Sequence, residues 1–374
     1  MSPQAAYLHV PFCVHRCGYC DFTVIAGRDD LIPAFLSAME RELSSLDSPQ
    51  PVRTLFLGGG TPTHLPPTAL RKFLQLASTW FPSSVDGEFS VEANPADLTD
   101  EKIALLANAG VNRVSLGAQS FDAAALDVLE RDHTPERIAD VVRSLQAAGI
   151  ENVSLDLIFG VPGQSLDSWQ NSLRQAIELE PKHISTYGLT IEKGTAFWNR
   201  VAKDELRTLP DELERTMYAV AIDELSAAGF EQYELSNFAR PGFACRHNQT
   251  YWQGEAYYGF GPGAARYLNG SRETNHRSVF TWLKRIEAGE SAVMDSETLT
   301  PQDRAHERLA LGLRMMAGID LQEFRSSTGF TIEDLAGAAI EQHLENGLLE
   351  IHAGRLRLTR EGRFVADTIT VDML

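Results

Sequence analysis

Three of the four cysteines in this 374-residue chain lie within eight residues, as Cys13, Cys17 and Cys20 in the segment HVPFCVHRCGYCDF. Structural zinc sites take four ligands, commonly from C-x2-C pairs that lie far apart, and this chain has no second pair. An iron–sulfur cube needs a ligand on each of four irons, and a short loop can supply three of them. The spacing therefore favours a [4Fe–4S] cluster with one open iron. The alternatives are zinc with His9 or His15 as fourth ligand and three inert core cysteines, although HRCGYC is polar for a core segment.

Glycine and polar residues gather where the predicted strands end. A glycine run follows the apolar segment TLFL, where side chains would keep a ligand from the backbone. Later strands carry polar groups at or just past their ends, and the fork of an arginine suits a carboxylate. These groups could converge on one ligand, although singly they also fit turns, caps or surface positions. They are Gly58, Gly59, Gly60, Glu92, Gln119, Arg131 and Asp156.

The elements that must position these residues alternate between short β-rich runs and amphipathic helical stretches, about six β/α units in all. Such repeats form a parallel sheet that binds ligands at the carboxyl ends of its strands, in an open or partial barrel or in a doubly wound sheet. The predicted strands are 6–10, 54–57, 88–92, 112–116, 153–159 and 183–189. The predicted helices are 31–46, 69–80, 99–109, 135–148 and 166–179.

The second half of the chain changes in character. After a predicted helix at 210–228, the aromatic and glycine-rich segment at 251–270 is expected to cover the sheet. Helices at 301–315 and 331–346 precede two short strands around Ala353 and Gly354, a pattern that resembles a winged helix. We therefore expect three regions: a barrel with the cluster site at 1–205, a covering and ligand-binding region at 206–295, and a small α+β domain at 296–374.

Composition limits the function. The 33 Lys and Arg residues against 51 Asp and Glu give 33 − 51 = −18, which argues against a broad basic face for nucleic acid. The N-terminus lacks the pattern of a signal peptide, and clustered cysteines suit a metal site in a reducing compartment, so a cytoplasmic protein is expected. Peripheral contact with a membrane surface and homodimerisation are left open.

The cysteine spacing after a first strand resembles the radical S-adenosylmethionine (SAM) superfamily, in which a reduced [4Fe–4S] cluster cleaves SAM to form a radical. The segments YLHVPFC, GGGTPT, NRVSLGAQSF and LDLIFGVPGQ resemble the oxygen-independent coproporphyrinogen dehydrogenase group within it. The resemblance implies a partial (β/α)6 radical-SAM barrel with a C-terminal winged-helix-like α+β domain. It also implies a SAM site lined by Tyr7, Tyr19, Gly59, Gly60, Thr61, Glu92, Gln119, Arg131, Asp156 and Gly188.

Two departures separate this chain from that enzyme. The enzyme's pattern has a fourth cysteine where this chain has Phe22. Only six residues precede Tyr7, so we expect the enzyme's long N-terminal lid to be absent. The segment HNQTYW is instead similar to the HNxxYW signature of the HemW branch, the heme chaperones. That resemblance implies heme near His247, since imidazole is a common axial ligand, and delivery to heme-accepting proteins such as respiratory hemoproteins. The alternative for this segment is a buried turn in which its aromatic residues fill the core.

Three hypotheses of function follow from these resemblances. A heme chaperone with a cluster, SAM and heme is favoured, and an oxidative decarboxylase of coproporphyrinogen is the enzymatic rival. A tRNA-modifying protein is disfavoured by the acidic net charge. Cys245, two residues before His247, is the one other soft ligand that we would test, and a thiol with no role is the alternative for it.

Overall fold

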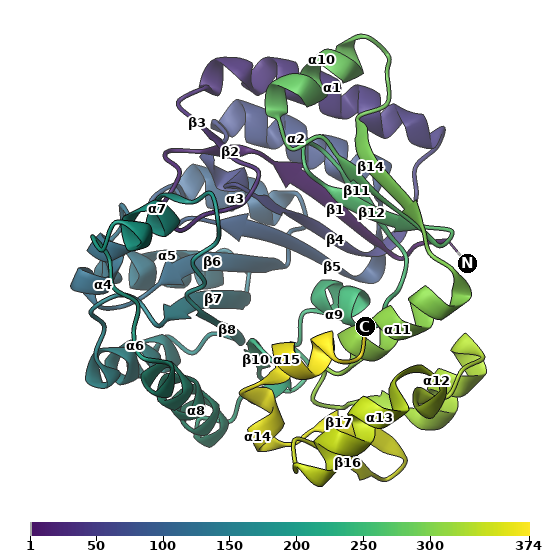
Figure 1. Ribbon diagram of the computed structural model, residues 1–374. Coiled ribbons are helices and arrows are strands. Elements are labelled where there is room, and N and C mark those ends of the chain that lie inside the picture. Colours follow the sequence, from purple (N-terminus) through teal and green to yellow (C-terminus); the bar gives the residue numbers. More distant parts are fainter. Residues whose placement is uncertain (1) are drawn as a thin grey trace.

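The computed structural model describes residues 2–374. Its centre is six parallel strands in the order β1-β4-β5-β6-β7-β8, so the strands follow one another in space as they do along the chain (Figure 1). All six carboxyl ends therefore face the same edge of the sheet. The strands are β1 (Ala5–Val10), β4 (Val52–Gly59), β5 (Ser83–Ala93), β6 (Arg113–Gln119), β7 (Asn152–Phe159) and β8 (His183–Gly188).

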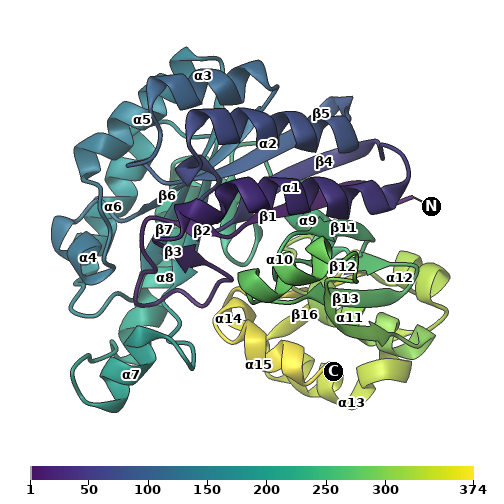
Figure 2. The ribbon, with the colours of Figure 1, turned by 90° about the horizontal axis from the view of Figure 1, so that it is seen from above.

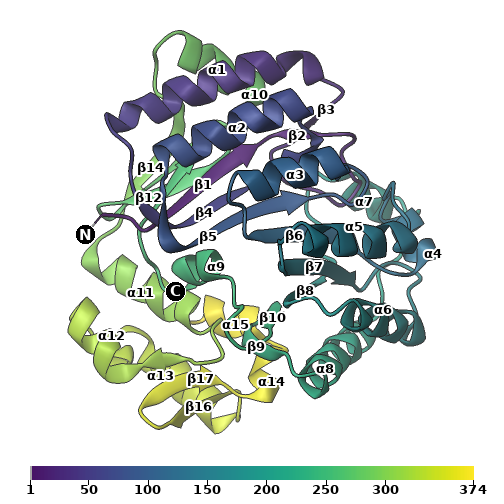
Figure 3. The same ribbon diagram turned by 180° about the vertical axis from the view of Figure 1, so that it is seen from behind.

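Helices cover the outer face of this sheet, which Figure 3 shows toward the viewer. Each helix turns an apolar stripe to the strands, and Phe35, Phe73 and Trp169 are fully buried in the shared core. Thr99, Thr134 and Ser165 accept backbone N–H groups at three helix starts, which fixes where those helices begin. The covering helices are α1 (Ile32–Leu43), α2 (Pro67–Trp80), α3 (Asp100–Asn108), α4 (Ala123–Val128), α5 (Pro135–Ala147), α6 (Leu166–Glu178) and α8 (Asp211–Ala227). Helix α7 (Ala196–Ala202) instead contacts the cysteine segment, where the N–H of Phe197 donates to the carbonyl of Gly18.

Residues 231–298 extend the sheet at both edges. β9 and β10 add to β8 in antiparallel order, while β11 pairs parallel with β1 and continues into β12, β13 and β14. The buried Glu42 of α1 ties the second extension down by accepting from the N–H of Gly261 and from the side chains of Asn275 and Trp282. The added elements are β9 (Glu231–Glu234), β10 (Asn237–Ala239), α9 (Arg246–Trp252), β11 (Tyr257–Phe260), β12 (Ala265–Leu268), β13 (Ser271–Asn275), α10 (Val279–Glu287) and β14 (Val293–Thr298).

The C-terminal part has a hydrophobic core of its own around Leu309, Phe324 and Leu356. It lies beside α9 and the β11–β14 extension (Figures 1 and 2). Its three-stranded sheet and helices form the small α+β domain predicted from the sequence, so the predicted fold class is confirmed. Its elements are α11 (Pro301–Gly312), β15 (Ile319–Asp320), α12 (Leu321–Thr328), α13 (Ile332–Glu345), β16 (Leu349–His352), β17 (Arg355–Leu358), α14 (Arg360–Arg363) and α15 (Ala366–Val371).

None of the helices formed by residues 2–374 has the length and apolar character needed to cross a membrane.

Candidate cluster and cofactor site

The cysteine loop begins directly after β1 and is pinned to the end of β4. The N–H groups of Gly60 and Thr61 donate to the carbonyls of Val10 and Phe12, at 2.8 Å each. Within the loop, β2 (Phe12–Cys13) pairs with β3 (Ile25–Ala26), and the N–H of Cys20 closes a turn onto the carbonyl of Cys17. Backbone hydrogen bonds therefore hold the loop at the carboxyl edge of the sheet, where sequence placed it.

The three thiols line one cavity of about 420 Å³ together with the strand ends. Burial, helped by the neighbouring thiols, raises the pKa of Cys13 to about 11, and burial likewise raises the pKa of Cys20. The guanidinium of Arg131 approaches the sulfur of Cys17 at 3.5 Å. Because burial disfavours the thiolates of Cys13 and Cys20, the three soft donors fit a cationic centre that stabilises thiolates, as an iron–sulfur cluster does.

Within residues 2–374, no three His, Cys, Asp or Glu side chains lie close enough to share a single metal ion. A [4Fe–4S] cluster does not require its cysteines to share one metal ion, because each thiolate binds a different iron.

The glycine run passes close against β1, and the space there admits no side chain. Gly59 has φ +108, and a Cβ atom on it would lie 2.2 Å from the ring of His9. A Cβ on Gly60 would lie 2.8 Å from the carbonyls of Val10 and Phe12. Any larger residue here would push the cysteine loop away from β4, which explains why glycine occupies these positions.

Two carboxylates face the cavity from β5 and β7, on either side of β6, and each is held by hydrogen bonds. Glu92 accepts from the N–H of Gly59 at 2.8 Å, and burial, with a smaller contribution from Asp156, raises the pKa of Glu92 to about 7. Asp156 accepts from the hydroxyls of Ser115 (2.9 Å) and Ser185 (2.7 Å), and burial raises its pKa as well. The cavity thus presents acceptors for a cationic or hydroxyl-bearing ligand beside the thiols.

Arg131 supplies the opposite charge at the same cavity. One of its Nη atoms donates to the carbonyl of Gly117, and its buried Nε has no hydrogen-bond partner among residues 2–374. Gln119 lies next to it with a positive φ of 63°, at the point where β6 ends. A buried guanidinium with a free donor fits a ligand carboxylate.

All the residues predicted for SAM except Tyr7 line this cavity. Tyr7 lies further back on β1, where its hydroxyl donates to Nδ1 of His9 at 2.9 Å, and it lines a second cavity instead. Its contact with SAM therefore stays a prediction. The residues that the structure brings together are Cys13, Cys17, Tyr19, Cys20, Gly59, Gly60, Thr61, Glu92, Gln119, Arg131, Asp156 and Gly188.

The sequence reading missed Ser115 and Ser185, whose hydroxyls hold Asp156. A pattern could have found them, because both are polar residues that interrupt apolar strands. Ser185 is in register with Asp156, and Ser115 is in register with Ser154, two residues before Asp156 on the same face of β7. Ser115 lies on β6 and Ser185 on β8, on either side of β7.

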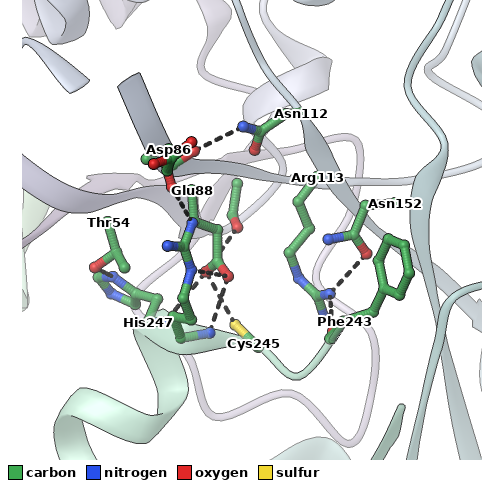
Figure 4. A network of polar contacts seen from close by, with 12 residues as sticks. Thr54, Asp86, Glu88, Asn112, Arg113, Asn152, Phe243, Cys245 and His247 are labelled. Carbon is green, nitrogen blue, oxygen red and sulfur yellow. Dashed lines mark hydrogen bonds and ion pairs between the residues drawn. The ribbon is translucent and has the colours of Figure 1, made fainter. Parts of the chain in front are cut away.

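His247 lies elsewhere, at the amino-terminal end of the sheet. Figure 4 shows its ring beside Thr54 of β4, with Glu88 and Cys245 next to it. Its Nδ1 hydrogen-bonds with the Thr54 hydroxyl at 2.9 Å and its Nε2 with the Tyr251 hydroxyl at 2.8 Å. The side chain is 1% exposed, and burial lowers its pKa to about 3, so the ring is neutral. The role of His247 as an axial ligand to heme iron stays a prediction. It would require the ring to lose its hydrogen bond with either Thr54 or Tyr251.

Cys245 is not part of the cluster cavity. Its thiol is buried and donates to the carboxylate of Glu88 at 3.4 Å, and burial raises its pKa to about 12 (Figure 4). Glu88 also accepts from the backbone N–H groups of Arg246 and His247, at 2.9 and 3.1 Å. One buried carboxylate therefore caps α9, since the residue before that helix makes no side-chain cap of its own.

The comparisons with known proteins agree with this geometry. The family model "Radical SAM superfamily" matches residues 7–176, and the model "HemN C-terminal domain" matches residues 299–365. The solved structure of coproporphyrinogen III oxidase (HemN) from Escherichia coli superposes with a TM-score of 0.87 at 20% identity, covering 99% of this chain and 90% of that one. The fold is that of a radical SAM protein.

Curated relatives narrow this class to one family. The "Heme chaperone HemW" of Bacillus subtilis is 36% identical over 98% of both chains, and that of Mycobacterium tuberculosis is 37% identical over 100% of this chain and 95% of its own. A mouse relative, "Radical S-adenosyl methionine domain-containing protein 1, mitochondrial", is 33% identical over 100% of this chain and 89% of its own. This chain belongs to the HemW family.

Proposed function

We propose that this chain is a heme chaperone that carries a [4Fe–4S] cluster and SAM, binds heme as its cargo and transfers it to heme-accepting proteins such as respiratory hemoproteins. The observation that carries the proposal is the single cavity in which Cys13, Cys17 and Cys20 meet the polar strand ends. Heme is proposed as the cargo because the chain belongs to the HemW family, whose relatives are named heme chaperones.

Each group in the cavity has a part in holding these cofactors. The three thiolates hold the cluster, and Arg131 offsets their negative charge from 3.5 Å away. Its unpartnered Nε can donate to the carboxylate of SAM, while Glu92 and the close approach of Gly59 and Gly60 suit its amino group. When bound, the reduced cluster supplies the electron that cleaves SAM.

The cluster is tested by anaerobic reconstitution. We expect the wild type to take up about four irons and to change its electron paramagnetic resonance spectrum when SAM is added, because SAM would bind the open iron. Cys17→Ser should lose the cluster, whereas the matched control Cys245→Ser should keep it, since Cys245 lies outside the cavity. Bound zinc, or a cluster spectrum that ignores SAM, would overturn this part of the proposal.

Heme transfer is tested on the same preparation. We expect the wild type to bind hemin and to pass it to an apo-hemoprotein, followed by the absorption of the acceptor. A turnover assay with coproporphyrinogen and a reductant distinguishes the rival, and formation of protoporphyrinogen would replace the chaperone by a decarboxylase. Protein that binds no hemin would remove the cargo from the proposal and leave the cluster site standing.

A further inference from the structure

A second cavity, larger than the cluster cavity, lies between the extended sheet and the C-terminal domain. It measures about 860 Å³, which is in the range of sites for sizeable organic ligands. Its walls come from α9, β11, β12 and β13 on one side and from α11 and α12 on the other, and α9 packs directly against α11 (Figures 1 and 3). Neither wall alone would enclose a ligand.

Aromatic side chains form much of this lining. Tyr251 and Trp252 enter from α9, Tyr257 from β11 and Tyr267 from β12. The rings of Tyr251 and Tyr257 stand edge to face, with centroids 4.7 Å apart. The indole nitrogen of Trp252 is buried without a hydrogen-bond partner among residues 2–374. Broad aromatic surfaces with a free donor at their margin fit a large, flat, apolar ligand.

Three arginines line the same cavity, together with the carboxylates of Glu255 and Glu307. Arg272 is paired with Glu297 and Glu307, and Arg308 with Glu323. Arg304 also lines the cavity and has no ion-pair partner among residues 2–374. An exposed guanidinium that lines an aromatic cavity and has no ion-pair partner is suited to a ligand carboxylate.

We propose that this cavity is the binding site of the tetrapyrrole cargo, with its macrocycle against Tyr251 and Tyr257 and a propionate paired with Arg304. The assignment rests on the proposed function for the identity of the cargo and adds the place where it binds. A flat macrocycle with carboxylates on one edge matches both the aromatic walls and the free arginine.

The assignment gives His247 a different part from the one predicted from sequence. His247 does not line the cavity, whereas Tyr251, one helical turn later on α9, does. The 2.8 Å hydrogen bond between the two side chains and the stacking of His247 on Phe56 fix the Tyr251 ring in the wall. His247 is thus a positioning residue that acts through Tyr251.

The large cavity and the cluster cavity share no lining residue. Tyr7 lines the large cavity, and burial together with the nearby Glu92 carboxylate raises the pKa of its phenol, while Glu92 itself lines the cluster cavity. A tetrapyrrole in the large cavity would therefore lie next to the SAM site but outside it, and the two ligands can be bound at once.

The test compares two ligands on the full-length protein: hemin and its dimethyl ester, which lacks both carboxylates. We expect the wild type to bind hemin about tenfold more tightly than the ester, because a good carboxylate–arginine pair contributes about that factor. Arg304→Gln should bind hemin about as weakly as the ester and should lose most of this preference. Arg71→Gln, on the exposed outer face of α2, is the matched control and should behave as the wild type.

A cavity-filling variant tests the location without relying on charge. Ala265 of β12 lines the cavity, and Ala265→Trp should abolish hemin binding while iron content and the SAM response of the cluster stay at wild-type levels. If Ala265→Trp does not fold, the comparison of hemin with its ester in Arg304→Gln decides alone. Unchanged hemin affinity and an unchanged ester preference in Arg304→Gln would overturn the location and leave the chaperone function intact. Wild-type protein that binds no hemin would instead overturn the proposed function.

Discussion

Charge at single residues decides how the cluster cavity responds to pH. Glu92 is the clearest case, because burial raises its pKa from about 4.5 to about 7. Between these values the folded protein keeps a proton that the unfolded chain has lost. The contribution of Glu92 to stability is therefore full below pH 4.5 and is lost as the pH rises through 7.

Glu92→Gln should consequently stabilise the cofactor-free protein at neutral and alkaline pH. We expect the melting temperature of the variant to match the wild type near pH 4.5 and to exceed it by about 2 °C at pH 8. Differential scanning fluorimetry across this range measures the effect, with Glu101→Gln on the exposed start of α3 as control. A difference that stays constant with pH would contradict the raised pKa of Glu92.

His247 gives a second prediction at this scale. An amide can replace its hydrogen bonds to Thr54 and Tyr251, so His247→Gln should keep hemin affinity within about threefold and leave the absorption maximum of ferric heme unchanged. His247→Ala should weaken binding by freeing the Tyr251 ring. A shifted heme absorption maximum in the Gln variant would show that His247 ligates the iron, as the sequence motif first suggested.

At the scale of elements, the start of helix α9 depends on a side chain from strand β5. Glu88 of β5 is 4% exposed and accepts two backbone N–H groups at the start of α9. Glu88→Ala would leave these donors buried without a partner and should cost about 2–4 kcal/mol of unfolding free energy. Glu88→Gln keeps an acceptor and should cost about 1 kcal/mol. Urea denaturation followed by tryptophan fluorescence separates the two variants, and equal stability of Glu88→Ala and the wild type would exclude the capping role.

Sequence patterns located the six parallel strands and their helices because both have clear hydrophobic periods. The hairpin of β16 and β17 was also predictable, since Ala353 and Gly354 take the positive φ values that a tight turn needs. The pairing of β11 with β1 was not, because it joins segments about 250 residues apart through a short, glycine-rich strand. Nothing local in HNQTYW shows that Thr54 and Glu88 will bury His247.

For the molecule as a whole, the cluster cavity could be predicted from the sequence and the large cavity could not. The cluster cavity collects residues that follow strand ends, and a parallel sheet brings such residues together by its topology. The large cavity needs the C-terminal domain to dock beside α9 and β12, and its arginines come from β13 and α11, where no motif marks them. The placement of the two hydrophobic cores against each other depends on many weak contacts, which leave no pattern in the sequence.

The two cavities should therefore protect different parts of the chain when filled. Saturating hemin should slow amide hydrogen exchange in α9, β12 and α11, because opening the space between the sheet and the C-terminal domain would first require release of the ligand. SAM added to the reconstituted cluster should instead protect residues 58–61 and 117–131, which border the other cavity. At a hundredfold excess over the dissociation constant, the slowing in each region should reach up to about a hundredfold. Hydrogen exchange with mass spectrometry resolves these segments, and hemin protection confined to the cysteine loop would place the tetrapyrrole in the cluster cavity instead.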